Sequence, residues 1–224
     1  MTRRNMALAS FLMVLGLTIV GVLVALELPA DRRLPIHWGL DGRPDGWADK
    51  WTALLLPPGI TAATALLFYA LPALEPKQEG LSRSQGLYLW GWAALLLIMA
   101  IIEVSVLSVA LGWGVPVNHL ITGGLGVVLV MIGNQLGKSR RMYMIGLRTP
   151  WTLSSEEVWI KTHRLAGKLM VGAGAVAILS ALLPLPAGLL VTIVVTGIGA
   201  AALIPIVYSY LLWRDERRSG QASE

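Results

Sequence analysis

Six long apolar runs dominate the sequence and constrain its fold more than any other feature. They cover roughly residues 6–28, 53–73, 87–112, 117–137, 166–185 and 188–212. Because a helix rises about 1.5 Å per residue, about 20 residues cross roughly 30 Å of hydrocarbon. Lipid offers the backbone no hydrogen-bond partners, which favours helices within it. The sequence therefore predicts an all-α polytopic membrane protein with six transmembrane helices. The first is an anchored helix, because its run exceeds the apolar region of a signal peptide.

The basic residues indicate how these helices are oriented. Only 14% of the chain is charged, against about a quarter in soluble domains. Of 18 Lys and Arg residues, 14 lie in the segments on one side of the predicted membrane. The other side, which comprises the segment 29–52 and the short connections at 113–116 and 186–187, has only Arg32, Arg33, Arg43 and Lys50. The positive-inside rule then places both termini and the segment 138–165 in the cytoplasm, and the segment 29–52 outside. The net charge of +5 is interpreted as flanking positive charge, so no direct nucleic-acid binding is expected.

Several chemistries have no signature in the sequence. Cysteine is absent, which excludes a disulfide framework, a thiolate metal site and a cysteine nucleophile. No His pairs with a carboxylate at a metal-ligand spacing, no Ser lies in a nucleophile elbow, and there is no phosphate-binding loop. We therefore expect no enzymatic activity, no metal and no cofactor, and look for recognition in the two long polar segments.

The polar segment between the fourth and fifth runs contains helix-start signals. Ser154 is predicted as an N-cap with Glu157 as its capping-box partner, and Leu153 and Val158 as a hydrophobic staple. Pro150 cannot lie inside that helix, so a turn is predicted at 146–153 and a helix from about 155 into the fifth run. Four side chains of this helix are expected at headgroup level: Trp159, Lys161, Arg164 and Lys168.

The polar segment 29–52 is predicted to be a compact loop over the bundle. A histidine and three aspartates recur every four residues: His37, Asp41, Asp45 and Asp49. Intervening glycines and a proline argue against a helix and indicate turns, so a metal site is not expected. Trp38, Trp47 and Trp51 are interpreted as interfacial anchors. The alternative is an outward-facing ligand surface comprising His37, Trp38, Asp45 and Trp47.

Glu103 is the one acidic residue deep within an apolar run. An intramembrane carboxyl is costly and is by default a functional candidate. It either stays protonated and bonds a neighbouring helix, with Ser105 and Ser108 nearby, or it serves a proton- or ion-coupled transporter. His119 lies within a turn of the outer surface, so its pairing with Glu103 requires staggered helices. Asn134 is expected to bond helices together.

The stretch "GNQLGKSRRMYMIGLRTPWTLSSEEVWIKTHRLAGKLMV" resembles the signature of the SdpI family of bacterial membrane immunity proteins. The matching motifs are Gly133-Asn134, Gly137-Lys138, Gly146 to Leu153, Trp159, Thr162-His163-Arg164 and Gly167-Lys168. The outer stretch from Leu34 to Trp51 resembles a region of unknown function that often precedes this signature. One departure is Arg141-Met142-Tyr143, where the family commonly has Pro-Asn-Tyr before the glycine.

The resemblance implies an integral immunity or sensing protein of the bacterial plasma membrane. Its implied partners are the lipid bilayer, a membrane-active secreted peptide toxin and, as for the best-known member, a cytoplasmic transcriptional repressor. It divides the chain into residues 1–86, with two helices and the outer loop, and 87–224, with four helices. The candidate cytoplasmic binding residues are Asn134, Lys138, Arg148, Thr149, Pro150, Trp151, Glu157, Trp159, His163 and Arg164. Two alternatives are a transporter that uses Glu103 and a membrane enzyme acting at the outer face.

Overall fold

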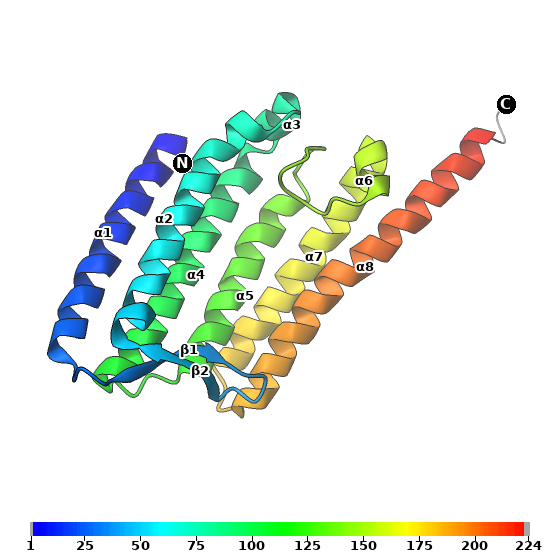
Figure 1. Cartoon of the computed structure of the whole chain (residues 1–224). Coiled ribbons are helices and arrows are strands. Elements are labelled where there is room, and N and C mark those ends of the chain that lie inside the picture. Colours follow the sequence, from blue (N-terminus) through cyan, green and yellow to red (C-terminus); the bar gives the residue numbers. More distant parts are fainter. Residues whose placement is uncertain (1, 222–224) are drawn as a thin grey trace.

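The structure, a computed structural model, describes residues 2–221 and contains within them eight helices and one β-hairpin (Figure 1). The elements are α1 (Arg3–Glu27), β1 (Arg33–Trp38), β2 (Pro44–Asp49), α2 (Lys50–Leu74), α3 (Gln78–Arg83), α4 (Gln85–Leu111), α5 (Val117–Leu136), α6 (Pro150–Ser154), α7 (Glu156–Ala181) and α8 (Ala187–Gln221).

Six helices in the described part of the chain are long and apolar enough to cross a membrane. They are α1, α2, α4, α5, α7 and α8, which confirms the predicted polytopic all-α fold. The helix α7 runs without a break from Glu156 to Ala181, as predicted from the helix-start signals. At 35 residues, α8 is about 50 Å long and exceeds the roughly 30 Å of hydrocarbon. Its C-terminal part projects beyond the other helices (Figure 1).

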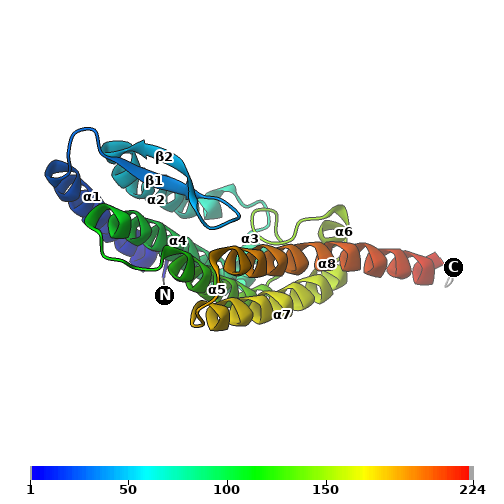
Figure 2. The same ribbon diagram turned by 90° about the horizontal axis from the view of Figure 1, so that it is seen from below.

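The spanning helices form one continuous bundle. Helix α2 packs against α1 and α4, α5 packs against α4 and α7, and α8 packs against α7 (Figures 1 and 2). The boundary predicted between residues 1–86 and 87–224 lies in the first turn of α4, inside this bundle. We call the end that carries α3 and α6 the inner end, and the end that carries the hairpin the outer end (Figure 1).

The segment expected to be a loop contains a β-hairpin, which the sequence analysis missed. Strands β1 and β2 are antiparallel, with register irregularities at Pro35 to His37 and at His37 to Trp38. Leu34 is fully buried with Val106 and Leu107 of α4, so the hairpin is anchored to the bundle. At its tip, Asn118 of α5 donates a hydrogen bond to the carbonyl oxygen of Gly42 (2.9 Å).

The junction between β2 and α2 is capped by Asp49. Its carboxylate accepts hydrogen bonds from the backbone N–H groups of Trp51 and Thr52 and from the Thr52 hydroxyl. The Thr52 hydroxyl, followed by the Thr52 N–H, lowers the pKa of the Asp49 carboxyl below its ordinary value. Lys50 then reaches back and donates to the carbonyl oxygen of Leu28 (2.5 Å), which ties the end of α1 to the start of α2.

Helices α5 and α7 are in close contact through two pairs of glycines. A Cβ on Gly133 would lie 2.8 Å from the carbonyl oxygen of Gly167, and one on Gly167 would lie 2.6 Å from that of Gly133. The pair Gly126 and Gly174 is equally close. Because no side chain fits there, the two backbones make direct van der Waals contact, as small residues permit in membrane helices. This contact fixes the start of α7 relative to the end of α5.

Candidate functional site

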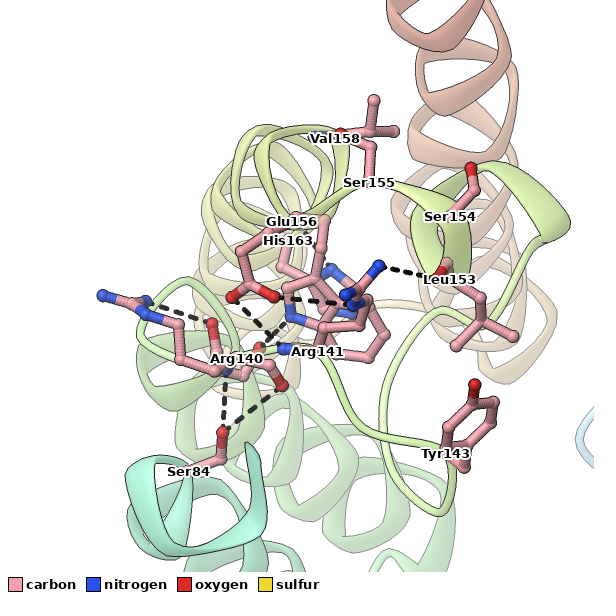
Figure 3. Close-up of polar contacts among 12 residues, drawn as sticks. Ser84, Arg140, Arg141, Tyr143, Leu153, Ser154, Ser155, Glu156, Val158 and His163 are labelled. Atoms are coloured by element: carbon pink, nitrogen blue, oxygen red, sulfur yellow. Dashed lines mark hydrogen bonds and ion pairs between the residues drawn. The ribbon is translucent and has the colours of Figure 1, made fainter. Parts of the chain in front are cut away.

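The chain between α5 and α7 folds back over the inner end of the bundle. We call residues 138–155, including α6, the cap. It is fixed by buried polar side chains that come from the neighbouring helices, and Figure 3 shows part of this arrangement.

Trp159 and His163 of α7 form the interior of the site. Both side chains are fully buried, and their rings stack with centroids 4.0 Å apart. Nδ1 of His163 lies 2.8 Å from the carbonyl oxygen of Trp159, which only accepts hydrogen bonds, so Nδ1 carries the hydrogen. Nε2 therefore accepts, and it receives the backbone N–H of Leu147 at 2.9 Å. The geometry specifies a neutral imidazole in one tautomer, which acts as a structural link between α7 and the cap.

Gly146 allows the cap to approach this histidine. Its φ is +120°, which residues with a side chain rarely adopt. A Cβ at Gly146 would lie 2.7 Å from Nε2 of His163 and 2.9 Å from the Trp159 ring. The glycine of the sequence motif is therefore required both by its backbone conformation and by the close approach.

The indole N–H of Trp159 fixes the first residues of the cap. It donates to the hydroxyl of Ser139 (3.2 Å), and that hydroxyl donates to the carbonyl oxygen of Leu136 at the end of α5 (2.8 Å). Trp159 is therefore not the headgroup anchor expected from the sequence, since its side chain is fully buried. Trp151 is only half-buried and packs edge-on against Tyr210 of α8, with centroids 5.1 Å apart.

The predicted capping box at Ser154 and Glu157 is wrong, because the capping box in this segment belongs to α6 and α7 is capped one residue after Ser154. Thr149 caps the short helix α6, with its hydroxyl accepting from the N–H of Thr152 (3.1 Å) and its own N–H donating to the Thr152 hydroxyl (2.9 Å). Pro150 follows at N1, where its missing N–H costs nothing. Helix α7 is then capped by Ser155, whose hydroxyl accepts from the N–H of Val158 (3.3 Å), and not by Ser154.

Glu75, which the sequence analysis overlooked, is a buried anchor of the cap. It follows α2 directly and its side chain is buried. Its carboxylate accepts hydrogen bonds from the N–H groups of Tyr143 (3.0 Å), Met144 (2.7 Å) and Lys77 (2.9 Å). A buried carboxylate is tolerated when such donors surround it. The only signal in the sequence was an isolated acidic residue just beyond an apolar run.

A second link joins the cap to the corner between α3 and α4. The hydroxyl of buried Ser84 accepts the N–H of Arg140 (2.8 Å). The guanidinium of Arg141 donates to the carbonyl oxygen of Leu153 (3.0 Å) and lies 3.7 Å from the carboxylate of Glu156 (Figure 3). The cap therefore contacts α2, α3, α4 and α7 through polar groups of its own backbone.

The remaining candidates on this side lie on the surface. Arg148 is exposed, and one of its guanidinium nitrogens donates to the carbonyl oxygen of Tyr143 (2.7 Å). Glu157 forms an exposed ion pair with Lys161 (2.6 Å). Four further candidates are also exposed: Asn134, Lys138, Pro150 and Arg164. The structure thus divides the predicted set into buried residues that hold the cap and exposed residues available to a partner.

The outer candidates lie on and beneath the hairpin. His37 and Asp45 contact each other across the strands, with Nδ1 to Oδ1 at 2.5 Å, and both are largely exposed. Trp38 is half-buried and Trp47 is exposed. Beneath the hairpin, a cavity of about 410 Å³ with mostly aliphatic walls lies among α4, α5 and α8. Its polar lining comes from His37, Asn118 and Thr122.

Glu103 and His119 do not come together as a pair. Glu103 is fully buried, and neither carboxyl oxygen has a hydrogen-bond partner among residues 2–221. The Ser105 hydroxyl donates instead to the carbonyl oxygen of Ile101 (2.7 Å). The ring of His119 contacts the carbonyl oxygen of Leu183 (3.1 Å). No cluster of three metal-ligating residues occurs in the described part of the chain.

Each of the two long polar segments lies within a region that matches a known protein family or domain. Residues 138–209 match the SdpI/YfhL protein family, and residues 12–62 match a domain of unknown function, DUF1648. The chain is 30% identical over 148 residues to "Immunity protein SdpI" of Bacillus subtilis (strain 168), which covers 66% of this chain and 69% of that protein. The chain belongs to the SdpI family. No solved structure matches it.

The family segment begins with the cap and contains α6, α7 and much of α8. In this SdpI-family chain, the motif residues Gly133, Gly146, Thr149, Trp159, His163 and Gly167 all serve helix contact or cap geometry. Arg148 is one of the exposed charged motif residues, together with Lys138, Arg164 and Lys168, and its guanidinium donates to the carbonyl oxygen of Tyr143.

Proposed function

We propose that this protein is an immunity protein of the bacterial plasma membrane, protecting its host against a membrane-active secreted peptide by binding and without chemistry. The observation that carries the proposal is the 30% identity to an immunity protein across two thirds of both chains. The structure supports binding as the mode of action, because the buried motif side chains that could act as acids or bases already form hydrogen bonds within the protein. His163, for example, has both ring nitrogens in hydrogen bonds to the backbone.

The proposal places the cap in the cytoplasm and the hairpin outside. It is supported by the distribution of basic residues, which gather in the segments at the inner end and are few at the hairpin. In this orientation the hairpin and the aliphatic cavity beneath it meet the peptide as it enters the outer leaflet. The cavity size falls in the range of about 300–1,000 Å³ that is usual for small-ligand sites.

The cap is proposed as the docking surface for a cytoplasmic partner, a transcriptional repressor by analogy with the best-known family member. Arg148 is the residue proposed to mediate docking. Its guanidinium is exposed and held in place by the Tyr143 carbonyl, and it presents a planar fork that lysine does not reproduce. The buried links from Glu75 and His163 keep the backbone around it rigid.

The experiment is a deletion of the gene in its host, followed by challenge with secreted peptides from neighbouring strains. The deletion strain is expected to lose viability in the presence of at least one such peptide, and the wild-type gene on a plasmid is expected to restore it. An unchanged sensitivity to every membrane-active peptide tested, with the protein verified in the wild-type membrane, would contradict the proposal.

The transporter alternative rests on Glu103, whose buried carboxyl has no partner among residues 2–221. Replacement by Gln separates the two functions, because Gln keeps the shape and polarity and removes proton exchange. Survival that persists with Glu103→Gln supports immunity by binding, whereas its loss at unchanged membrane level supports a coupled carrier.

A further inference from the structure

A polar cleft of about 460 Å³ lies at the inner end, between α3 and the cap. It is distinct from the Arg148 surface and none of its basic residues is assigned a role by the immunity proposal. Four basic and two acidic residues line it: Lys77, Arg83, Arg140, Arg141, Glu79 and Glu156. The lining therefore carries two positive charges in excess.

The walls of the cleft are held rigidly. Helix α3 touches the cap backbone at Gly80, where a Cβ would collide with the carbonyl oxygen of Arg141. Ser84 at the start of α4 bonds the backbone of Arg140 on the other side (2.8 Å), as Figure 3 shows. Because both contacts involve backbone atoms, the basic side chains start from fixed positions, which lowers the entropic cost of binding.

Two of the four cations have no acid to neutralise them. Arg83 forms an ion pair with Glu79 (2.9 Å), and Arg141 lies 3.7 Å from Glu156. Among residues 2–221, neither Lys77 nor Arg140 forms an ion pair. The Lys77 ammonium lies over the Tyr143 ring, 5.5 Å from its centroid, and the Arg140 guanidinium contacts the carbonyl oxygen of Ser139 (3.2 Å). Both cations therefore retain donor capacity toward an anion.

The residues around the cleft are of the types found at a membrane–water interface. Gln78, which lines the cleft, also lines an adjoining crevice with Arg3 of α1. The Arg3 guanidinium lies over the Tyr69 ring, 4.6 Å from its centroid, and the Tyr69 and Tyr143 side chains are exposed. Exposed tyrosines and flanking arginines at helix ends are typical of the membrane–water interface.

We propose that this cleft binds the phosphate of an anionic phospholipid headgroup between Lys77 and Arg140. The excess charge of the lining selects an anion, and the guanidinium and ammonium donors suit phosphate oxygens. Because the cleft lies at the membrane–water interface in this proposal, lipids of the adjoining leaflet can bring their phosphate groups to it. This site is directional, unlike the general attraction of basic residues to anionic membranes.

The test measures the binding of a short-chain phosphatidylglycerol to the full-length protein in neutral detergent, with phosphatidylcholine as the uncharged comparison. Removal of one interfacial charge is expected to weaken binding about fivefold, so Lys77→Gln and Arg140→Gln should each do so. Glu79→Gln should tighten binding, because it removes a competing carboxylate. Arg140→Lys, which keeps the charge, should bind more tightly than Arg140→Gln, and this separates loss of charge from loss of fold.

The matched control is Lys168→Gln, which removes an exposed basic residue of α7 that does not line the cleft. Its phosphatidylglycerol affinity should stay at the wild-type value. An equal loss for Lys168→Gln and Arg140→Gln, or equal binding of phosphatidylcholine and phosphatidylglycerol, would overturn the proposal. Displacement of the lipid by millimolar inorganic phosphate would identify free phosphate as the ligand and would overturn the lipid assignment.

Discussion

Replacing Glu75 tests whether the cap is held by the buried carboxylate. The carboxylate accepts three backbone N–H groups, from Lys77, Tyr143 and Met144. Glu75→Gln keeps one acceptor oxygen. The other oxygen is replaced by an amide N–H₂, which donates hydrogen bonds and cannot accept them from the backbone N–H groups. Because the Tyr143 N–H contacts both oxygens, either orientation of the amide leaves one backbone N–H without an acceptor and places it against the amide N–H₂. An unsatisfied buried donor costs about 1–3 kcal/mol, and the opposed donors favour the upper end, about 3 kcal/mol. Such a change raises the population of an opened cap about 100-fold.

Limited proteolysis reports this opening directly, because the cap contains Lys138 and Arg148 as trypsin sites. If opening is fast relative to cleavage, the cleavage rate follows the population of the open form. Glu75→Gln should therefore be cut within residues 138–148 about 100 times faster than wild type, with the spanning helices still intact. The control is Glu79→Gln, which removes an exposed ion pair worth about 0–1 kcal/mol. Equal cleavage of Glu75→Gln and Glu79→Gln would refute the role given to the buried carboxylate.

Three further predictions concern the bundle. Gly167→Ala should destabilise the purified protein by about 1–3 kcal/mol in thermal unfolding, because its Cβ would lie 2.6 Å from a carbonyl oxygen of α5; Gly172→Ala on the same helix has open space and should not. Glu103→Gln should leave expression and peptide survival unchanged, and a selective loss of survival would show that the carboxyl exchanges a proton or binds a cation. A single cysteine at Asp41 should react with an impermeant reagent on intact cells, while one at Ser154 should not; the reverse pattern would invert the proposed orientation.

The spanning helices were predictable because each is specified by its own composition. Twenty apolar residues form a helix in lipid whatever they contact, so the count and approximate limits of the spans follow from the sequence. What the sequence did not show is that Gly133 faces Gly167, because the pairing of two antiparallel helices depends on their relative register.

The errors occurred where local signals competed. Ser154 and Ser155 are both good N-caps, and the choice between them was decided by Thr149, which starts a separate short helix that uses residues up to Ser154. In the outer segment, Gly39 and Gly42 correctly indicated the turn between the strands. Pro44 and Gly46 also indicated turns, but they lie in β2, and the turn signals obscured two short strands that are stabilised by packing Leu34 against α4. Strand formation there depends on the tertiary contact, which local propensity does not contain.

Glu75 was missed for a different reason. Its partners are backbone groups about 70 residues away, and backbone donors leave no mark in an amino-acid sequence. By the same logic, Trp159 was interpreted as a lipid anchor from its place near a span end, although its indole is buried by the cap. Side chains whose partners are main-chain atoms are therefore the part of this site that required the structure.

The most direct test of the proposed function is Arg148→Lys in the living host, measured as survival of peptide challenge together with the amount of protein in the membrane. Lysine preserves the charge, so general attraction to anionic lipid is unchanged, but it cannot form the bidentate contacts of a guanidinium. The account predicts reduced survival at a wild-type membrane level, while Arg164→Lys, at another exposed arginine of the motif, retains protection. Normal survival with Arg148→Lys would contradict the claim that docking at the cap contributes to protection.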